Sequence, residues 1–356
     1  MSEKRRVLTI GAFDLVKGVG MFCIVVGHTI SRYQNSLLII NILIRILGIG
    51  MMPMFFLISG IGYKKTNQKK LVKKLKKELL RPYLYVTIAT TLLFPLCHYL
   101  AFQWLPGAVK EGIRTTLAYL TGSAKSGKTI FGISIYECSV IWFFLALFWA
   151  SLILNSILRF DEKWKQMVMV CFCVIAGFVC SSLNIWYFCI PQGLLAVGYM
   201  YFGYCIKRSG WLEKKWKKWQ LIVLGVISAF EIIYGETNLA YLIFKRGIFD
   251  YVGAGLTGLF MICIALQLNQ YNGTIAEIVA KIGRYTYYAM CVHSVEINCI
   301  PWYLLSEKFT HYQNVGLFLE VFLRSCILIV ACKIINRITT YRRKQKRKKL
   351  CTMRNI

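Results

Sequence analysis

Acidic residues are scarce in this sequence, which has 15 Asp and Glu against 44 Lys and Arg and a formal net charge of +29. A basic excess of this size raises the question of a nucleic-acid partner. Proteins that bind nucleic acid gather their cations on one face of a soluble domain, and no stretch of this chain has the composition of such a domain. The sequence therefore argues against nucleic acid, and the cations need another explanation.

Cysteine motifs are also missing, although the chain contains 14 cysteines. There is no Cys-x-x-Cys pair and no Cys and His spacing of the kind that binds metal ions. The cysteines are scattered through apolar segments, where a free thiol behaves as a small apolar side chain. We therefore expect no metal site and no disulfide framework.

The sequence shows no low-complexity linker, no internal repeat and no cleavable signal peptide. Its first apolar segment is long and charged, and it lacks the small-residue pattern of a cleavage site. We therefore predict one transmembrane domain over residues 1–356, which ends in a basic cytoplasmic tail at about residues 337–356.

Apolar residues, in contrast, make up 57% of the chain, and the mean hydropathy is +0.54. Apolar runs of about 20 residues recur, each long enough to cross a hydrocarbon core of roughly 30 Å. We predict an all-α polytopic bundle in the lipid bilayer with about ten transmembrane helices, the fifth and seventh of them short. The predicted spans are residues 8–30, 37–63, 83–103, 140–158, 167–181, 185–206, 221–234, 248–266, 285–305 and 315–335.

The cations follow the predicted spans in a regular way. Each cluster comes after an even number of spans, whereas loops after an odd number, such as 31–36 and 306–314, are nearly free of Lys and Arg. Positive loops stay on the cytoplasmic side. We therefore predict a multi-pass protein of the plasma or inner membrane with both termini in the cytoplasm. The clusters are residues 4–6, 64–81, 159–165, 207–218 and 333–354.

Two of the predicted loops are long enough to fold by themselves. In residues 64–81, pairs of Lys alternate with apolar residues, which predicts an amphipathic helix on the cytoplasmic surface. Its lysines would bind anionic lipid or attract a polyanionic cofactor. On the other side, we expect residues 104–138 to form an external cap or a re-entrant segment.

The first predicted span carries three ionisable side chains. Lys17 and His28 are eleven residues apart, almost three helical turns, so both project from one face about 16 Å apart along the axis. Asp14 lies one turn before Lys17 on the same face. Such groups are costly inside a membrane unless they face protein or water, and they indicate a functional site. The simpler alternative is that Asp14 and Lys17 only pair with each other.

Other candidate residues lie in later spans. His293 and Glu296 are one turn apart on the ninth span, where they would form an acid–base pair, an acceptor-binding pair or a structural hydrogen bond. Arg81, at the cytoplasmic end of the third span, would contact donor phosphates or extend to lipid headgroups. Ser59 in the second span would line a site or allow close helix contact.

Further charged and titratable residues have no assigned role at this point. Arg45 and Glu231 lie within the second and seventh spans, where they would pair with each other or line a passage. His98 and His311 fall near the predicted outer surface, and we expect them to be surface residues.

The stretch from Asp14 to His28 resembles the first span of the membrane acyltransferase-3 family. In that family a basic residue and a His are separated by ten residues. The fucose 4-O-acetylase-like branch has Lys after an Asp where Arg is commoner, as Lys17 is here. Five further motifs resemble the family in its own order, with Thr286 where Ser is commoner: MPMFFLISG at 52–60, LRPY at 80–83, WFFL at 142–145, YFGY at 201–204 and IGRYTYYAMCVH at 282–293.

The resemblance implies an integral-membrane O-acyltransferase. It would move an acyl group, with acetyl expected, from cytosolic acetyl-CoA or another acyl-CoA to a hydroxyl of an envelope or secreted saccharide or glycolipid. Acyl-CoA would be a substrate, with no permanently bound cofactor. Such a reaction needs a base beside the acceptor oxygen and positive charge for the donor or the developing oxyanion.

Histidine suits the base because its reference pKa of about 6.5 leaves the neutral form available at neutral pH. We therefore predict that His28 is the base, that Lys17 binds donor phosphate or steadies the site, and that Asp14 holds Lys17. Arg81 is the second predicted donor-binding residue. The predicted acceptor-binding residues are Ser59, His293 and Glu296.

Two non-enzymatic alternatives use the same charges. A transporter or polysaccharide-export component would place intramembrane charges along a substrate pathway, but it has no need of a base at position 28. A sensor or ligand-binding membrane domain would be expected to carry a second module, and none is recognisable in this sequence.

Overall fold

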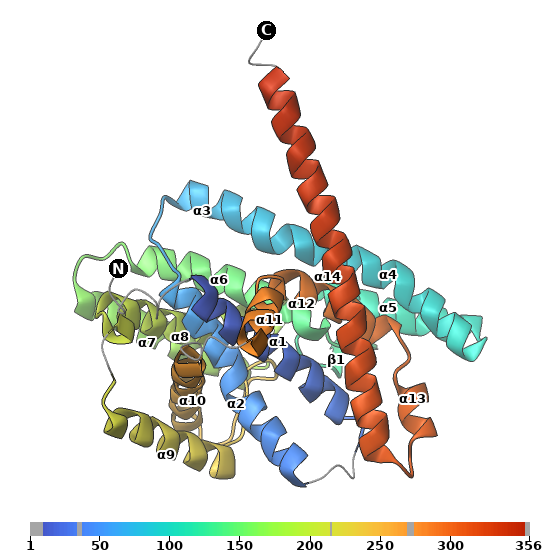
Figure 1. Ribbon diagram of the computed structural model, residues 1–356, viewed down its shortest axis with the longest axis horizontal. Helices are drawn as coiled ribbons and strands as arrows, with labels where there is room; N and C mark the ends of the chain where they lie inside the picture. The colour runs from blue at the N-terminus through green and yellow to red at the C-terminus, as the bar shows by residue number, and fades with distance from the viewer. Residues whose placement is uncertain (1–9, 34–37, 214–215, 269–273, 353–356) are drawn as a thin grey trace.

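The computed structural model of the protein describes residues 10–33, 38–213, 216–268 and 274–352. Within them, helices follow one another along the chain, and the strands form two short antiparallel hairpins (Figure 1). The predicted all-α class is confirmed. The longer helices are α1 (Ile10–Ile30), α2 (Leu38–Ile61), α4 (Arg81–Phe102), α5 (Leu105–Thr121), α6 (Trp142–Ile157), α7 (Lys163–Ser182), α8 (Ile190–Arg208), α9 (Lys218–Tyr234), α10 (Ile248–Leu268), α12 (Thr286–Cys299) and α14 (Gln313–Thr352).

Shorter elements connect these helices. They are α3 (Gln68–Leu75), a π-helical turn (Lys76–Leu80), α11 (Thr274–Gly283), α13 (Tyr303–Lys308) and three 3₁₀ turns (Ser139–Ile141, Tyr187–Cys189 and Trp211–Glu213). Strands β1 (Lys128–Ile130) and β2 (Ile133–Ile135) pair antiparallel with Lys128 opposite Ile135. Strands β3 (Thr237–Asn238) and β4 (Ile243–Phe244) pair antiparallel with Thr237 opposite Phe244.

Long apolar helices make this a multi-pass membrane protein. Among the described residues, 7 helices are long and apolar enough to cross a membrane, and Gly48–Ile61 in α2 is a shorter apolar segment. Each of the ten predicted spans coincides with helical structure. Three of the corresponding helices, α6 with 16 residues, α9 with 17 and α12 with 14, are shorter than the roughly 20 residues that cross a hydrocarbon core. The 3₁₀ turn Ser139–Ile141 extends the first of them.

The ninth predicted span, residues 285–305, is not one helix. It is divided into α12 and α13, with Ile300 in an extended conformation between them. Pro301 explains the interruption, because a proline has no N–H to continue the helix and disfavours the helical conformation of the preceding residue. The break places Trp302 beside the end of α12.

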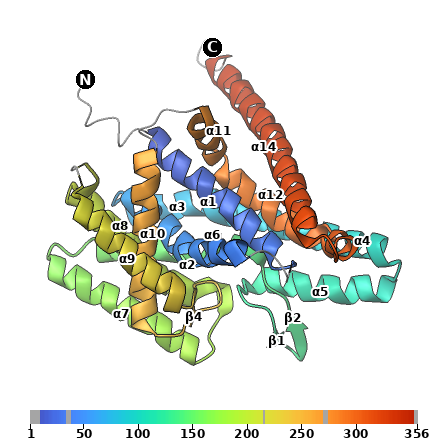
Figure 2. The ribbon, with the colours of Figure 1, turned by 60° about the horizontal axis from the view of Figure 1, so that its bottom comes forward.

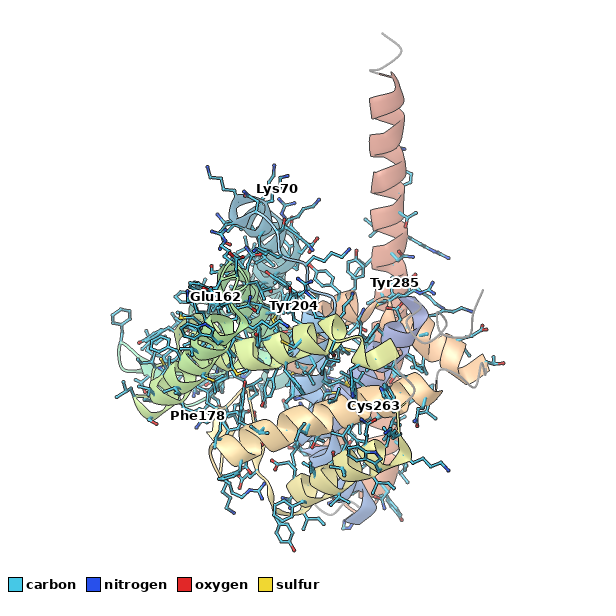
Figure 3. The ribbon with its side chains drawn as sticks, turned by 90° about the vertical axis from the view of Figure 1, so that its left-hand side faces the viewer. Lys70, Glu162, Phe178, Tyr204, Cys263 and Tyr285 are labelled. Atoms are coloured by element: carbon cyan, nitrogen blue, oxygen red, sulfur yellow. The ribbon has the colours of Figure 1, made fainter. Side chains whose placement is uncertain are left out.

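The predicted amphipathic helix at residues 64–81 is present as α3 and the π-helical turn, which run directly into α4. The Asn67 side chain caps its start by accepting a hydrogen bond of 2.9 Å from the Lys69 N–H. Leu71, Leu75 and Leu79 face the protein and are buried. The lysines project from the other side, as Lys70 does in Figure 3.

Helix α1 lies inside the bundle, where it packs against α2, α11, α12 and α14 (Figures 1 and 2). Its contact with α11 is a backbone contact. A Cβ atom at Gly283 would lie 1.7 Å from the Asp14 carbonyl oxygen, and one at Gly18 would lie 2.2 Å from the Val279 carbonyl oxygen. Small residues let membrane helices approach in this way, so these two glycines fix the position of α1.

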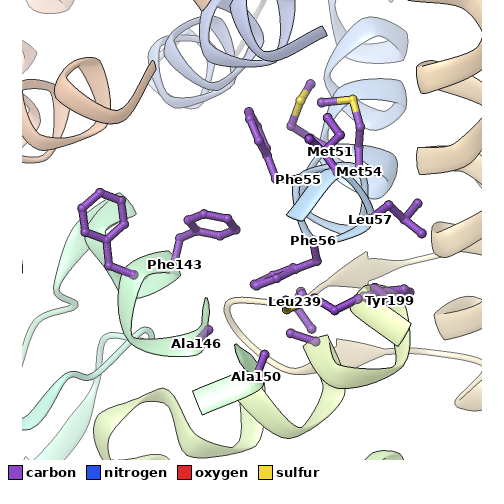
Figure 4. Close-up of a cluster of buried hydrophobic side chains, with 14 of the residues drawn as sticks. Met51, Met54, Phe55, Phe56, Leu57, Phe143, Ala146, Ala150, Tyr199 and Leu239 are labelled. Carbon is purple, nitrogen blue, oxygen red and sulfur yellow. The ribbon is translucent and has the colours of Figure 1, made fainter. Parts of the chain in front are cut away.

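The motif at residues 52–60 lies in the largest hydrophobic cluster of the protein, between α2, α6 and α8 (Figure 4). The rings of Phe56 and Phe143 have centroids 4.7 Å apart, and those of Phe55 and Phe143 are 6.0 Å apart. In a bilayer, close van der Waals packing of this kind holds helices together. This part of the motif therefore supports the bundle.

Residues 104–138 were expected to form a cap or re-entrant segment, and they fold as helix α5 followed by the β1–β2 hairpin. Ala118, Ile135 and Trp186 form a small buried cluster that joins this segment to the residues before α8. Arg114 pairs with Glu111 at 3.0 Å and lies over the Tyr136 ring. The segment is therefore an ordered part of the fold.

The two ends of the bundle carry different elements (Figure 2). The start of α1 and the end of α14 lie at one end of the molecule, and the β1–β2 hairpin lies at the opposite end. Helix α1 runs between them, so Lys17 lies toward the first end and His28 toward the second. We call these the Lys17 end and the His28 end.

Candidate active site

Helices α1 and α12 bring two histidines together. His28 lies in the last turn of α1, and His293 lies in α12. Their ring centroids are 5.6 Å apart, and the rings are inclined by 59°. His293 is 0% exposed, whereas His28 is half-buried and lines a cavity. A substrate in that cavity would therefore meet His28 first.

A carboxylate holds the His293 ring. Nδ1 of His293 lies 2.6 Å from Oε1 of Glu296, one turn further along α12. A carboxylate can only accept a hydrogen bond, so Nδ1 carries a proton, and in the neutral ring Nε2 keeps its lone pair. Nε2 is buried without a hydrogen-bond partner among the described residues. The ring therefore has a fixed tautomer and a free basic nitrogen.

The same carboxylate has two further partners. The indole N–H of Trp302 donates to Oε2 of Glu296 at 2.7 Å, and Arg324 Nη1 lies 3.6 Å from Oε1. The Arg324 guanidinium also covers the Trp302 ring, 4.8 Å from its centroid. Glu296 is thus fixed by partners from α14 and from the turn after α12, and it can hold His293 in one orientation.

A second buried carboxylate, Glu320 of α14, completes the charge network. It contacts Arg324 at 2.8 Å and Arg32 at 3.2 Å, and it accepts a hydrogen bond of 3.0 Å from the Tyr33 hydroxyl. Arg32 also donates to the carbonyl oxygen of His28 at 3.0 Å. Glu320 and Arg324 are each 0% exposed. Because each buried charge has an opposite charge nearby, the network can exist inside a membrane protein.

The cavity beside His28 has a volume of about 260 Å³. It is bounded by α1, α2, the segment that leads into α6, and the β3–β4 segment. Polar groups from outside the helices reach into it, among them Glu137, Asn238 and Tyr241. The cavity gives a hydroxyl-bearing molecule a place beside His28.

Asp14 and Lys17 lie in separate surroundings at the other end of α1. The Lys17 amine is 3.4 Å from Oδ1 of Asp14, and Nε of Arg284 is 3.4 Å from Oδ2. Asp14 is buried and Lys17 is partly exposed. The predicted pairing of Asp14 with Lys17 is therefore observed, but the structure does not bring this pair to His28.

A second cavity, of about 460 Å³ and largely apolar, lies between α1, α11, α12 and α14. Lys281 and Lys333 line it, and so do Val25, Ala289 and Ser325. Val25 precedes His28 by one turn on α1, Ala289 precedes His293 by one turn on α12, and Ser325 follows Arg324. The cavity therefore runs beside α1 toward the histidine pair.

The sequence model of the acyltransferase-3 family, described as an acyltransferase domain, matches residues 10–337, which is most of the chain. The protein belongs to the acyltransferase-3 family. No curated protein and no solved structure matches the chain significantly. The histidine pair and its charge network are therefore the candidate active site of a membrane acyltransferase.

The other predicted site residues of this acyltransferase lie outside the histidine pair and its charge network. The Ser59 hydroxyl donates to the carbonyl oxygen of Phe55 in its own helix at 2.8 Å. Arg81 is exposed at the start of α4. Their roles in binding acceptor and donor stay predictions, and the Ser59 contact shows that its hydroxyl has a partner within α2.

Arg45 and Glu231 do not pair with each other. Arg45 donates to the Gly235 carbonyl at 3.0 Å, whereas Glu231 forms an ion pair with Arg246, which also contacts Asp250 at 2.5 Å. These contacts fasten the β3–β4 segment to α9 and α10. The charge of Glu231 therefore stabilises the β3–β4 segment.

Sequence reasoning missed Glu320, Arg324, Arg32, Tyr33 and Trp302. A usable signal was present for the first two, because they are opposite charges four residues apart inside the tenth apolar span. Such a pair is a candidate for function in any membrane helix. Arg32 and Tyr33 follow the end of the first predicted span, where a polar residue is unremarkable, and Trp302 lies in an apolar run where a tryptophan gives no signal.

We also considered possible metal ligands among the residues that the structure describes. Among the described residues, no three or more His, Cys, Asp or Glu side chains are placed to hold a metal ion. The described cysteines are free thiols, several of them buried in the bundle.

Proposed function

We propose that this membrane acyltransferase moves an acyl group, with acetyl expected, from cytosolic acyl-CoA to a hydroxyl of an envelope or secreted saccharide. The observation that carries the proposal is His28, open to a cavity and backed by His293, whose ring is fixed by Glu296. A base beside a space for the acceptor is what acyl transfer to a hydroxyl requires.

In this proposal His28 is the general base. It takes the proton of the acceptor hydroxyl while that oxygen attacks the thioester carbonyl, which gives a tetrahedral oxyanion. The oxyanion collapses, the carbon–sulfur bond breaks, and the CoA thiolate takes the proton from His28. The products are an ester and free CoA, and the base returns to its neutral form.

His293 and Arg324 act from behind His28. The His293 ring packs against the His28 ring and positions it, because Glu296 prevents His293 from turning. Arg324 keeps positive charge close to the pair, and its Nε has no hydrogen-bond partner among the described residues. Fixed positive charge near a developing oxyanion lowers the barrier to acyl transfer.

The donor would extend along α1. Lys17 and Arg284 supply cations at one end for the phosphates, about 16 Å along the helix axis from His28. The long pantetheine arm of CoA is suited to this separation, since it carries the thioester far from the nucleotide phosphates. The apolar cavity between α1, α11, α12 and α14 lies beside this route.

The experiment measures acetyl transfer from labelled acetyl-CoA to envelope glycans in membranes with matched amounts of wild-type and His28→Ala protein. We expect His28→Ala to fold, because His28 faces a cavity, and to lose activity by about 10²–10⁴-fold, which is the usual contribution of a positioned base. Transfer at the wild-type rate by His28→Ala would overturn the mechanism.

Purified protein distinguishes an acyltransferase from a transporter or polysaccharide-export component. A purified, folded protein that binds CoA and transfers the label is the expected result. A folded protein that neither binds CoA nor transfers the label would exclude acyl-CoA as the donor.

A further inference from the structure

A further cavity lies beside the candidate active site, at the His28 end. It has a volume of about 550 Å³, within the usual range for small-molecule sites of about 300–1,000 Å³. Helix α4, the end of the β1–β2 segment, and the turn between α12 and α13 enclose it. The mechanism proposed above assigns no role to this cavity.

One wall of the cavity is aromatic. The rings of Phe102 and Tyr303 are nearly parallel, with an interplanar angle of 7° and centroids 5.8 Å apart. The His98 ring lies 4.6 Å from the Phe102 ring and extends the same wall. An aromatic face carries partial negative charge, so it favours the C–H face of a sugar ring.

Two side chains that line this cavity each have a polar atom that is buried without a partner among the described residues. These atoms are Nδ1 of His98 and the hydroxyl oxygen of Tyr303. A buried polar atom without a partner is destabilising, and it needs a partner or an explanation. A ligand with several hydroxyl groups would supply hydrogen bonds to both atoms. The expectation that His98 is a surface residue is therefore replaced, because its ring is half-buried in a cavity wall.

The cavity also adjoins the histidine pair. Glu137 and Tyr241 line both this cavity and the one beside His28, and the Tyr241 hydroxyl donates to Glu137 at 2.6 Å. Trp302 lines the larger cavity while its indole N–H holds Glu296. A molecule in the larger cavity is therefore separated from His28 only by side chains.

The charged side chains of the cavity limit the class of ligand that it can bind. Among the described residues, the charged side chains that line the cavity are Arg32 and Glu137. Both are already engaged, Arg32 with Glu320 and Glu137 with Tyr241. An anionic ligand would need a free cation, whereas an uncharged polyhydroxyl ligand needs the hydrogen-bonding groups and the aromatic wall that are present.

We infer that this cavity is the acceptor site and that it binds an uncharged pyranose unit of a glycan against Phe102 and Tyr303. This inference rests on the proposed function. Glu137 and Tyr241 line both cavities, and the hydroxyl to be acylated would reach His28 alongside this hydrogen-bonded pair. These two residues are positioning residues, and His98 and Tyr303 select the sugar.

Tyr303→Phe is the sharpest variant, because it removes only the unpartnered hydroxyl. If no ligand binds the Tyr303 hydroxyl, its removal should not lower the stability of the protein, since deleting a buried polar atom without a partner is neutral or stabilising. The acceptor-site role predicts a KM for acceptor raised about three- to tenfold, as expected for one lost hydrogen bond, and an unchanged KM for acetyl-CoA. Tyr312→Phe, an exposed tyrosine outside the cavity, is the matched control.

Binding is measured separately through Cys97, a half-buried thiol that lines the cavity. Its alkylation by iodoacetamide in the purified protein is followed by mass spectrometry of the peptides. The probe is the oligosaccharide fraction released from the envelope of cells that lack the protein, and it also serves as the acceptor for the KM. We expect it to slow alkylation of Cys97 and to leave the exposed Cys171 unaffected.

The outcomes are distinguishable. Protection of Cys97 together with a higher acceptor KM in Tyr303→Phe supports the acceptor site. Normal transfer by the wild type, with Cys97 unprotected and Tyr303→Phe unchanged, overturns it and leaves the proposed function intact. Absence of transfer in the folded wild type overturns the proposed function, and protection of Cys97 then still shows a saccharide site in this cavity.

Discussion

At the scale of single residues, a histidine acts as a general base only where a substrate can reach its free nitrogen. His28 meets this condition because it lines a cavity, whereas His293 is wholly buried behind it. The two histidines therefore have different functions in the proposed mechanism. His28 exchanges the proton, and His293 holds the first ring in place.

The variant Glu296→Gln tests this division. The amide can donate to Nδ1 of His293, which allows the other tautomer and removes the negative charge beside Arg324. We expect kcat to fall by about 10–100-fold, the range found when the partner that orients a metal-binding histidine is changed, with the KM for acetyl-CoA unchanged. Steady-state kinetics on membranes measure both constants. An unchanged kcat would remove His293 and Glu296 from the mechanism.

Lys17 tests the donor end of α1. Because it lies about 16 Å along the axis from His28, its loss is expected to affect donor binding more than the chemical step. Lys17→Ala should raise the KM for acetyl-CoA with little change in kcat, which is the pattern of a lost binding contact. Lys17→Arg keeps the charge and should retain more activity. A fall in kcat alone, with a normal KM, would place Lys17 in the chemistry instead.

At the scale of elements, the position of α1 depends on its contact with α11. Gly283→Ala would put a methyl group 1.7 Å from the Asp14 carbonyl oxygen, so the helices must separate. Overpacking of this kind costs about 1–3 kcal/mol or more. We expect a lower apparent Tm and reduced transfer, measured by thermal unfolding in detergent and by acetyl incorporation.

Gly62→Ala is the matched control for that variant. A Cβ atom there meets only the Ile58 carbonyl at 3.5 Å and the Ser59 carbonyl at 3.7 Å, which are ordinary contacts. It should behave as the wild type in both assays. Equal Tm values for Gly283→Ala and Gly62→Ala would show that the contact between α1 and α11 is not needed for stability.

The pattern of long apolar runs was enough to predict most of the helices, because a segment in lipid must satisfy its own backbone groups. It also placed His293 and Glu296 one turn apart. It failed at Ile300, where Pro301 ends α12 within an apolar run. It could not place His28 beside His293, because that contact depends on how α1 and α12 pack. Glu320 and Arg324 were overlooked because their span is otherwise strongly apolar.

At the scale of the whole molecule, the two groups of functional residues lie at opposite ends of α1. Helix α3, whose lysines are exposed, and the ends of the described chain lie away from the β1–β2 hairpin (Figure 2). This arrangement agrees with a cytosolic donor at the Lys17 end and an acceptor outside at the His28 end. It requires α3 and the hairpin to lie on opposite sides of the membrane.

Cysteine labelling tests that requirement, on a background in which the native cysteines are replaced. Lys70→Cys in α3 and Lys125→Cys before β1 are both at exposed positions. A maleimide that does not cross membranes should label position 125 in intact cells, and should label position 70 only after the membrane is permeabilised. We expect this separation from the charge pattern, since lysine-rich loops generally stay on the cytoplasmic side. Labelling of position 70 in intact cells would reverse the topology, and the donor would then have to bind from outside.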